Sequence, residues 1–145
     1  MNLQLRNGAG DVIEVYDPLR RRWLVLTPEE RVRQAFVCRL LSECHVPVSR
    51  IANEVAINLN GVTRRCDTVI YADDLSPVAI VEYKAPGVRV SRKAFEQIVS
   101  YNMVFHVGHL ILSDGLSDYA FRVDYEAHRC IPLDHLPTYA ELTAR

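Results

Sequence analysis

The segment at residues 78–84 constrains the fold most, because it is apolar until its last three residues, Glu82, Tyr83 and Lys84. A short uninterrupted apolar run is typical of a central β-strand that is covered on both faces. Side chains alternate across a strand, so Glu82 and Lys84 share one face while Tyr83 lies on the other. Burying either charge alone costs free energy, so we expect a compensating partner: an ion pair, another group or a metal.

A helix is predicted over about residues 28–44, because its start signals are clear. Thr27 is a good N-cap, Pro28 occupies the first helical position, and Glu30 would complete a capping box with Thr27. Apolar side chains then recur at helical spacing, and Pro47 lies just beyond the expected end.

Strand signals occupy much of the remaining chain. Asn60-Gly61 is a strong signal for a tight hairpin. A second helix is expected over about residues 91–105. The order of helix, three-strand meander, helix and further strands predicts an α/β (α+β) architecture, a mixed sheet with helices packed on it. The expected strands are residues 12–16, 22–26, 55–59, 62–71, 78–84, 109–113, 119–125 and 129–133.

Length and composition restrict the class of protein. The chain has 145 residues, of which 49% are hydrophobic and 24% charged. These values are ordinary for a globular chain of this size, and we expect one domain, residues 1–145, with its core over about residues 12–135. No apolar run is long enough to span a membrane and no secretory leader is evident, so we expect a cytoplasmic protein. The formal net charge of -1 gives no support to a generic DNA-coating protein.

Hairpin geometry brings a second carboxylate to the end of the central strand. If the loop at residues 72–77 closes symmetrically, Tyr71 pairs with Val78, and Asp67 then lies directly opposite Glu82. Directly opposed residues of an antiparallel pair have Cβ atoms roughly 5 Å apart. The register therefore predicts two neighbouring carboxylates.

Two interpretations of this pair are open. Two carboxylates so close repel unless one is protonated or a cation lies between them, and Mg²⁺ prefers such oxygen ligands together with waters. Lys84 would be close enough to reach a water or a phosphate beside that metal. The alternative is a cluster of ordinary ion pairs, Glu82 with Lys84 and Asp67 with Arg64 or Arg65.

These residues resemble the core motif of the PD-(D/E)xK nuclease superfamily, which has an Asp followed by Glu-x-Lys on the next strand. Gln97 and Tyr101 form Q-x-x-x-Y on the following helix, as in the branch with RecB-like nucleases and type I restriction R subunits. Further stretches resemble a small stand-alone family related to the N-terminal nuclease domain of the type I restriction enzyme R protein. The resemblance covers about residues 12–135 and implies a restriction-endonuclease-like core. These stretches are residues 17–20 (DPLR), 27–34 (TPEERVRQ), 81–86 (VEYKAP) and 97–102 (QIVSYN).

The resemblance implies a metal site and a catalytic lysine. Asp67 and Glu82 would hold Mg²⁺ (or Mn²⁺) together with the backbone carbonyl of Tyr83, and the metal would polarise the scissile phosphate and activate water. Lys84 would orient that water or stabilise charge on the phosphorus. Tyr83 stands where the family more often has Cys, but its side chain faces away from the site.

Other residues would complete this site. Gln97 and Tyr101, one helical turn apart, would position DNA phosphate or support Lys84, although Tyr101 also fits the apolar stripe of its helix. Glu30, with Glu29 as the reserve, would be the acidic residue of the first helix, in competition with its capping role. The predicted phosphate contacts are Arg64, Arg65, Arg89, Arg92 and Lys93.

The sequence thus favours a Mg²⁺-dependent DNA endo- or exonuclease-like phosphodiesterase. One alternative is an inactive nuclease-fold module that binds DNA or a partner protein, and another is a structural domain with a salt-bridge cluster. Arg33 could be a buried partner for a carboxylate. The near-zero charge limits unaided DNA binding, so a partner protein or a homodimer remains part of the hypothesis.

Overall fold

The computed structural model describes residues 3–87 and 90–144, and a six-stranded mixed sheet lies at its centre. The strand order is β4-β5-β6-β7-β8-β9, and β6 and β7 are its parallel neighbours, joined through helix α2 as a crossover. This mixed α+β sheet confirms the predicted fold class. The strands are β4 (Ile51–Leu59), β5 (Val62–Tyr71), β6 (Pro77–Tyr83), β7 (His109–Ser113), β8 (Asp118–Asp124) and β9 (Arg129–Pro132).

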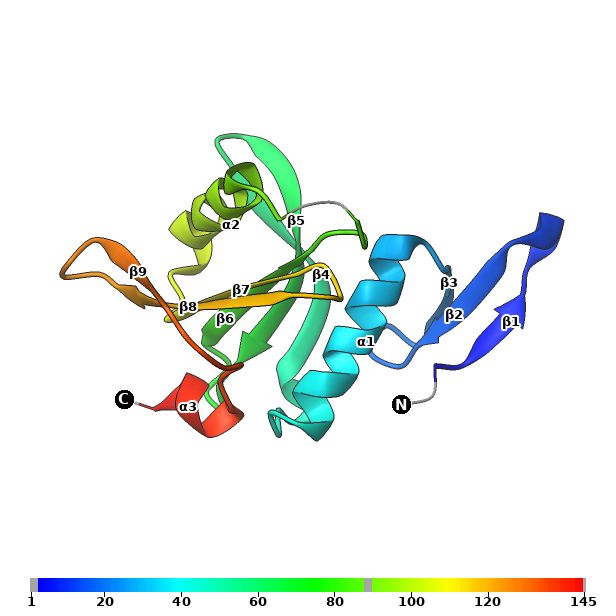
Figure 1. Cartoon of the computed structure of the whole chain (residues 1–145), viewed down its shortest axis with the longest axis horizontal. Coiled ribbons are helices and arrows are strands. Elements are labelled where there is room, and N and C mark those ends of the chain that lie inside the picture. Colours follow the sequence, from blue (N-terminus) through cyan, green and yellow to red (C-terminus); the bar gives the residue numbers. More distant parts are fainter. Residues whose placement is uncertain (1–2, 88–89, 145) are drawn as a thin grey trace.

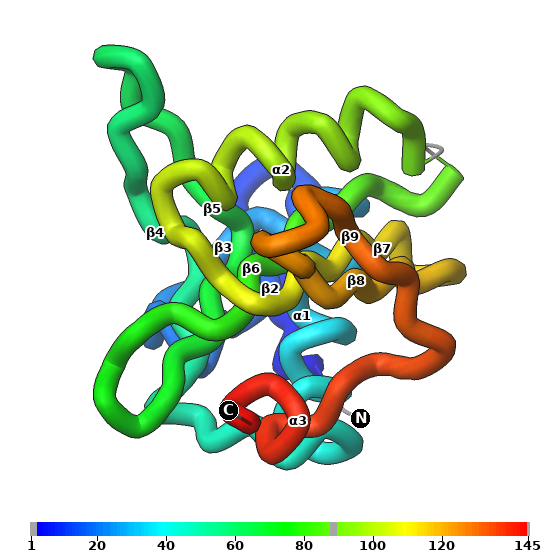
Figure 2. The backbone as a smooth tube through the Cα atoms, turned by 90° about the vertical axis from the view of Figure 1, so that its left-hand side faces the viewer, coloured from blue at the N-terminus to red at the C-terminus, as the bar shows by residue number. Residues whose placement is uncertain are grey.

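Helices cover both faces of this sheet (Figures 1 and 2). Helix α2 packs on one face, and α1 and α3 lie on the opposite face. Within the described ranges, no helix is long and apolar enough to cross a bilayer. The helices are α1 (Pro28–Ser42), α2 (Arg92–Phe105) and α3 (Tyr139–Thr143), and short 3₁₀ turns occupy η1 (Ala9–Asp11) and η2 (Val48–Arg50).

Strand β6 contributes to both hydrophobic layers, as its apolar run predicts. Val81 and Tyr83 pack with Phe36 of α1, whereas Ile80 packs with Ile98 of α2. All five side chains are almost completely buried. The alternation of β6 therefore sends Tyr83 towards α1 and leaves the opposite face of the strand end to Glu82.

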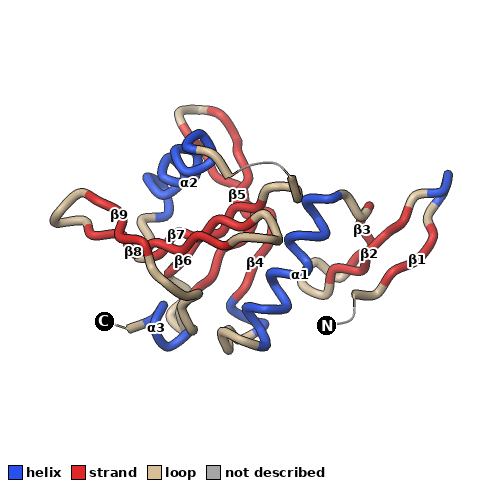
Figure 3. The backbone as a smooth tube through the Cα atoms, viewed as in Figure 1, coloured by secondary structure: helices blue, strands red, loops and turns tan. Residues whose placement is uncertain are grey.

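A second, smaller sheet lies beyond α1 (Figures 1 and 3). Its order is β1-β2-β3, and both strand pairs are antiparallel. The sequence predicts β2 and β3 but not the short edge strand β1. The strands are β1 (Leu5–Asn7), β2 (Ile13–Asp17) and β3 (Arg22–Val25).

The start of α1 confirms one half of the predicted capping box and corrects the other. The Thr27 hydroxyl accepts a hydrogen bond from the Glu30 amide at 3.0 Å, as an N-cap should. The Thr27 amide, however, donates to the Val25 carbonyl at 3.0 Å. The Glu30 side chain is thereby released from the cap and turns to arginine partners.

The β5–β6 register is the one that places Asp67 opposite Glu82, although its loop end differs from prediction. The pairs Thr68 with Val81, Val69 with Ile80, and Ile70 with Ala79 follow the predicted register. Tyr71 pairs with Pro77 and not with Val78, because a bulge lies between Ile70 and Tyr71. The bulge absorbs the asymmetry of the loop without moving the other end of the hairpin.

Candidate active site at the ends of β5 and β6

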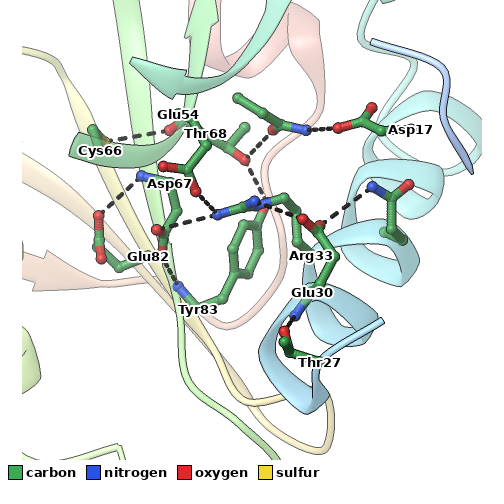
Figure 4. A network of polar contacts seen from close by, with 12 residues as sticks. Asp17, Thr27, Glu30, Arg33, Glu54, Cys66, Asp67, Thr68, Glu82 and Tyr83 are labelled. Carbon is green, nitrogen blue, oxygen red and sulfur yellow. Dashed lines mark hydrogen bonds and ion pairs between the residues drawn. The ribbon is translucent and has the colours of Figure 1, made fainter. Parts of the chain in front are cut away.

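Two carboxylates interlock where the β5–β6 ladder ends (Figure 4). Beyond the pair Thr68 and Val81, the backbone amides donate to side-chain carboxylates and not to the carbonyls of the neighbouring strand. The Asp67 amide donates to Glu82 Oε1 at 3.2 Å, and the Tyr83 amide donates to Asp67 Oδ2 at 2.9 Å. Each carboxylate is therefore fixed by a backbone amide of the neighbouring strand, and the two residues lie side by side as the register predicts.

Burial makes this pair electrostatically unusual. Glu82 is 5% exposed and Asp67 is 9% exposed. Burial, and then repulsion by Asp67, raises the pKa of Glu82 to about 9, which Lys84 opposes only in part. Burial also raises the pKa of Asp67, against the opposing effects of the Tyr83 amide and Arg33. Without a cation between them, the two carboxyl groups hold a proton at neutral pH.

The chemistry of these donors fits a hard divalent cation. Two carboxylates, with the Tyr83 carbonyl next in the chain, are oxygen ligands of the type that Mg²⁺ accepts, and Mg²⁺ keeps several waters in such sites. In residues 3–87 and 90–144, no group of three or more His, Cys, Asp or Glu is arranged to hold a metal ion. The pair suits a cation that needs only two carboxylates from the protein.

Lys84 follows the pair at the end of β6. Its amide donates to the Ser113 carbonyl of β7 at 2.9 Å, which anchors the backbone there. Among the described residues, Glu82 and Lys84 form no ion pair, so the salt-bridge alternative is wrong for this pair. The ammonium is close enough to lower the pKa of Glu82 and Glu29 against the effect of their burial.

Glu54 of β4 interrupts the sheet beside Asp67. Its φ is 57°, a left-handed conformation that is uncommon for a residue other than glycine. Glu54 and Asp67 do not pair, although the pairs on both sides of them are regular: Asn53 with Thr68, and Val55 with Cys66. The ladder between β4 and β5 is thus interrupted at the position of Asp67.

The interruption also changes which face β4 presents to each helix. Ile51, before Glu54, packs in the layer with α1, whereas Val55 and Ile57, after it, pack in the layer with α2. Strict alternation would place all three odd-numbered residues on one face. The face that β4 presents to each helix thus changes at its left-handed residue, Glu54.

Arg33 of α1 supplies the positive charge of this cluster (Figure 4). Its Nη1 donates to Glu30 Oε1 at 3.0 Å, and its Nη2 contacts both Glu54 Oε1 and Asp67 Oδ1, the latter at 3.4 Å. Burial lowers the pKa of Arg33, but Glu30, Glu54 and Asp67 outweigh this effect and raise it. Its Nε has no hydrogen-bond partner among the described residues.

This arrangement decides one of the alternatives left open by the sequence. Arg33 is a buried partner of carboxylates, as one interpretation suggested. The expectation that Asp67 pairs with Arg64 or Arg65 is wrong, because α1 delivers Arg33 to the inner side of Asp67.

The two glutamates at the start of α1 have different surroundings. Glu30 Oε1 accepts from Arg20 at 2.7 Å as well as from Arg33, and Glu30 Oε2 accepts from Gln34 at 3.3 Å. The pKa of Glu29 is raised by burial and then by Asp67, while Lys84 and Arg33 oppose the shift. Glu29 thus lies in electrostatic reach of both Asp67 and Lys84.

Asp17 ties the smaller sheet to this network and was not among the predicted site residues. It is fully buried and accepts hydrogen bonds from the Leu19 amide at 2.8 Å and from the amide and side chain of Arg20. Burial would raise the pKa of Asp17, but the hydrogen bonds from Arg20 and Leu19 outweigh it and lower the pKa. Arg20 then continues to Glu30, so the D-P-L-R stretch orders the start of α1.

A chain of neutral groups continues from Asp17 to β6. Asn53 Nδ2 donates to Asp17 Oδ2 at 3.4 Å, and Asn53 Oδ1 accepts from the Thr68 hydroxyl at 2.7 Å. Thr68 and the Tyr83 hydroxyl share a hydrogen bond of 2.9 Å. The Tyr83 ring lies edge-on to Phe36 with centroids 5.7 Å apart, so it faces away from Glu82, as predicted.

Gln97 and Tyr101 lie on the face of α2 that approaches the site. Gln97 Nε2 donates to Tyr101 Oη at 2.7 Å. Tyr101 is buried in the layer with Ile98. Burial raises its pKa, the Gln97 hydrogen bond opposes the shift, and the charges of Glu82 and Asp67 also contribute. Tyr101 therefore combines the core position and the proximity that the sequence predicted as alternatives.

The predicted phosphate contacts are spread over two elements. Arg64 and Arg65 are exposed on β5, and Lys93 is exposed at the start of α2. Arg92 pairs with Glu96 at 3.1 Å on the surface of α2. Arg89 lies outside the described residues.

Comparisons with known proteins give a family and a fold. The sequence profile described as type I restriction enzyme R protein N terminus (HSDR_N) matches residues 28–137. A solved fragment of a protein assigned as an HsdR subunit of a type I restriction enzyme from Vibrio vulnificus YJ016 has a TM-score of 0.61 and 20% sequence identity. The match covers 81% of this chain but only 24% of that one, and at this identity it shows the fold alone. A comparison with curated proteins finds no match.

Proposed function

The chain belongs to the family of the type I restriction enzyme R protein N terminus, and from this membership we propose its function. We propose that it is a PD-(D/E)xK-type DNA phosphodiesterase that depends on Mg²⁺ or Mn²⁺. The observation that carries this proposal is the interlocked pair of buried carboxylates, Asp67 and Glu82, with Lys84 beside them. A structural domain has little reason to bury two neighbouring carboxyl groups at a strand end.

The residues of the pair would hold the cation in a fixed place. A bound divalent ion would polarise the scissile phosphate and lower the pKa of the attacking water. Asp67 and Glu82 are already oriented by backbone amides, so little rearrangement is needed to present their oxygens, together with the Tyr83 carbonyl. Lys84 would stabilise the negative charge that develops on the phosphoryl oxygens.

Residues around the pair would position the DNA. Gln97, already bonded to Tyr101, would direct its amide at a backbone phosphate or support Lys84. The exposed cations would contact neighbouring phosphates without reading sequence. Glu29, in reach of Asp67 and Lys84, is the better placed acidic residue of the first helix, and Glu30 would act through Arg33. These cations are Arg64, Arg65, Arg89, Arg92 and Lys93.

A second candidate is a nuclease-fold module that binds DNA or a partner protein without cleaving. One observation favours it: Arg33 already places a positive charge against Asp67. A buried arginine that neutralises the pair would make a metal unnecessary. The formal net charge of -1 also limits the affinity for DNA that this chain can reach alone.

Thermal melting in the presence of metal tests the metal site. A ligand at about 100 times its Kd stabilises the folded state by about 2.7 kcal/mol, which is about 8 °C for a chain of this size. We expect Mg²⁺ or Mn²⁺ to raise the Tm of the wild type and to leave the Tm of Asp67→Ala unchanged. Glu43→Gln, a control at an exposed carboxylate, should show the same rise as the wild type. No rise in the wild type would refute the metal site.

Cleavage of DNA separates the two candidates. If the chain is an enzyme, it degrades DNA only with the metal, and Lys84→Ala loses cleavage but keeps the metal-induced rise in Tm. Metal binding by the wild type with no cleavage of single-stranded or double-stranded DNA would favour the binding module.

A further inference from the structure

One guanidinium nitrogen is shared by two carboxylates with different expected roles. Arg33 Nη2 contacts Glu54 Oε1 in a short ion pair, whereas its distance to Asp67 Oδ1 is 3.4 Å. The same nitrogen is therefore bound more closely by Glu54 than by Asp67. Glu30 binds the other terminal nitrogen, Nη1, at 3.0 Å, so both terminal nitrogens of Arg33 are in ion pairs.

Glu54 reaches this position through an unfavourable backbone conformation. Its φ of 57° is left-handed, a conformation that costs conformational free energy in any residue other than glycine. It does not pair with Asp67, yet its carboxylate turns back to α1 and binds Arg33. The strain and the buried ion pair coincide at one residue, directly beside Asp67.

We propose that Glu54 is a positioning residue that draws Arg33 away from Asp67 and so leaves the Asp67 carboxylate free to bind a divalent cation. Asp67 Oδ2 is held by the Tyr83 amide, so Oδ1 is the oxygen for which Arg33 and a cation compete. A charge-assisted hydrogen bond is about twice as strong as a neutral one, so a neutral side chain at position 54 would release Arg33 to Asp67. This inference rests on the proposed metal site.

Calorimetric titration with Mg²⁺ or Mn²⁺ tests the inference. Glu54→Gln keeps the size and the hydrogen-bonding capacity of the side chain but removes its charge, and we expect the Kd for the metal to rise about tenfold, or about 1.4 kcal/mol. Glu54→Gly, which relieves the left-handed strain, should weaken metal binding to the same extent. Circular dichroism should show that this variant remains folded. An unchanged Kd in both variants overturns the proposal.

A double-mutant cycle with Arg33 distinguishes this competition from a general charge effect. Removing a negative charge weakens a nearby cation site in any model, but that effect would be equally large with or without Arg33. Competition predicts that Glu54→Gln changes the Kd by less than about twofold in an Arg33→Gln background. The same tenfold loss in both backgrounds overturns the proposal.

A crystal structure of Glu54→Gln gives an answer even if Arg33→Gln does not fold. We expect Arg33 Nη2 to approach Asp67 Oδ1 from 3.4 Å to ordinary ion-pair distance, about 2.8 Å. A distance that stays at its present value overturns the inference. If the wild type binds no divalent metal at all, the proposed function fails, and the distance in Glu54→Gln still decides whether Glu54 restrains Arg33.

Discussion

The raised pKa of Glu82 predicts that metal binding releases a proton. Burial and the adjacent Asp67 raise this pKa from 4.5 to about 9, so the metal-free site is protonated at neutral pH. A metal needs the deprotonated carboxylate as its ligand, so binding must expel the proton. The perturbation that tests this is a change of pH during metal titration.

The expected size of the effect follows from the fraction of deprotonated Glu82. With a pKa of about 9, about one molecule in a hundred has lost this proton near pH 7, and about one in ten near pH 8. The apparent affinity for the metal should therefore rise about tenfold for each unit of pH between about 6 and about 8. It should level off as the pH passes the pKa.

The same shift has a definite sign in the metal-free protein. A carboxyl group whose pKa is raised by folding binds its proton more tightly in the folded state. Its stabilising contribution is fully present below the unfolded pKa of 4.5 and is lost as the pH rises through about 9. Metal-free protein should thus become less stable over this range, and metal should reverse the loss.

Isothermal titration calorimetry provides the assay. Titrating Mg²⁺ in two buffers with different ionisation enthalpies counts the protons released, and we expect about one per metal near pH 7. Glu43→Gln, at an exposed residue of the opposite end of α1, should keep the same pH slope. Metal binding with no proton release and no pH slope would refute the reasoning about the pair, whereas absence of binding would refute the metal site itself.

The remaining predictions concern the network that supports the site. Glu30→Gln should keep the Thr27 cap but lower the free energy of unfolding by about 1–3 kcal/mol in urea titrations, because two arginine side chains lose a charged acceptor; unchanged stability would contradict the assignment. Asp17→Asn should lower it by about 3–5 kcal/mol at neutral pH, because Arg20 loses its buried partner. Since the pKa of Asp17 is lowered from 3.8, this difference should shrink as the pH falls below that value, and a difference that persists in acid would oppose the account. Tyr83→Phe should cost about 1 kcal/mol through its bond to Thr68 and leave metal affinity unchanged, as calorimetry would show.

The main sheet and its two long helices follow from local sequence patterns. The Thr27 and Ser91 caps, the Asn60-Gly61 turn and the apolar run of β6 act over a few residues, so the sequence alone locates these elements. The β5–β6 register also follows locally, because one hairpin loop determines it. The bulge at Tyr71 escaped prediction, since nothing in the loop sequence distinguishes it from symmetric closure.

The part of the site around Arg33 could not be predicted in the same way. Arg33 and Glu54 are 21 residues apart, and Arg33 and Asp67 are 34 apart, so their contacts depend on how α1 docks on the sheet. Strand β4 begins at Ile51, before the predicted alternation at Val55, because Glu54 breaks the pattern that identifies a strand. Glu54, which lies beside Asp67 in the structure, is thus also the residue that prevents the sequence from revealing the first part of β4.

The position of the site at the end of a ladder has a physical basis. In an unbroken sheet, backbone amides are consumed by neighbouring carbonyls, so none is left to orient a carboxylate. The β5–β6 ladder ends at the pair Thr68 and Val81, so the Asp67 amide becomes available to Glu82 and the Tyr83 amide to Asp67. The Asp and Glu-x-Lys residues alone therefore do not make the site. The carboxylates become a fixed pair because the β5–β6 ladder ends beside them, and Glu54 adds the ion pair that binds Arg33 next to Asp67.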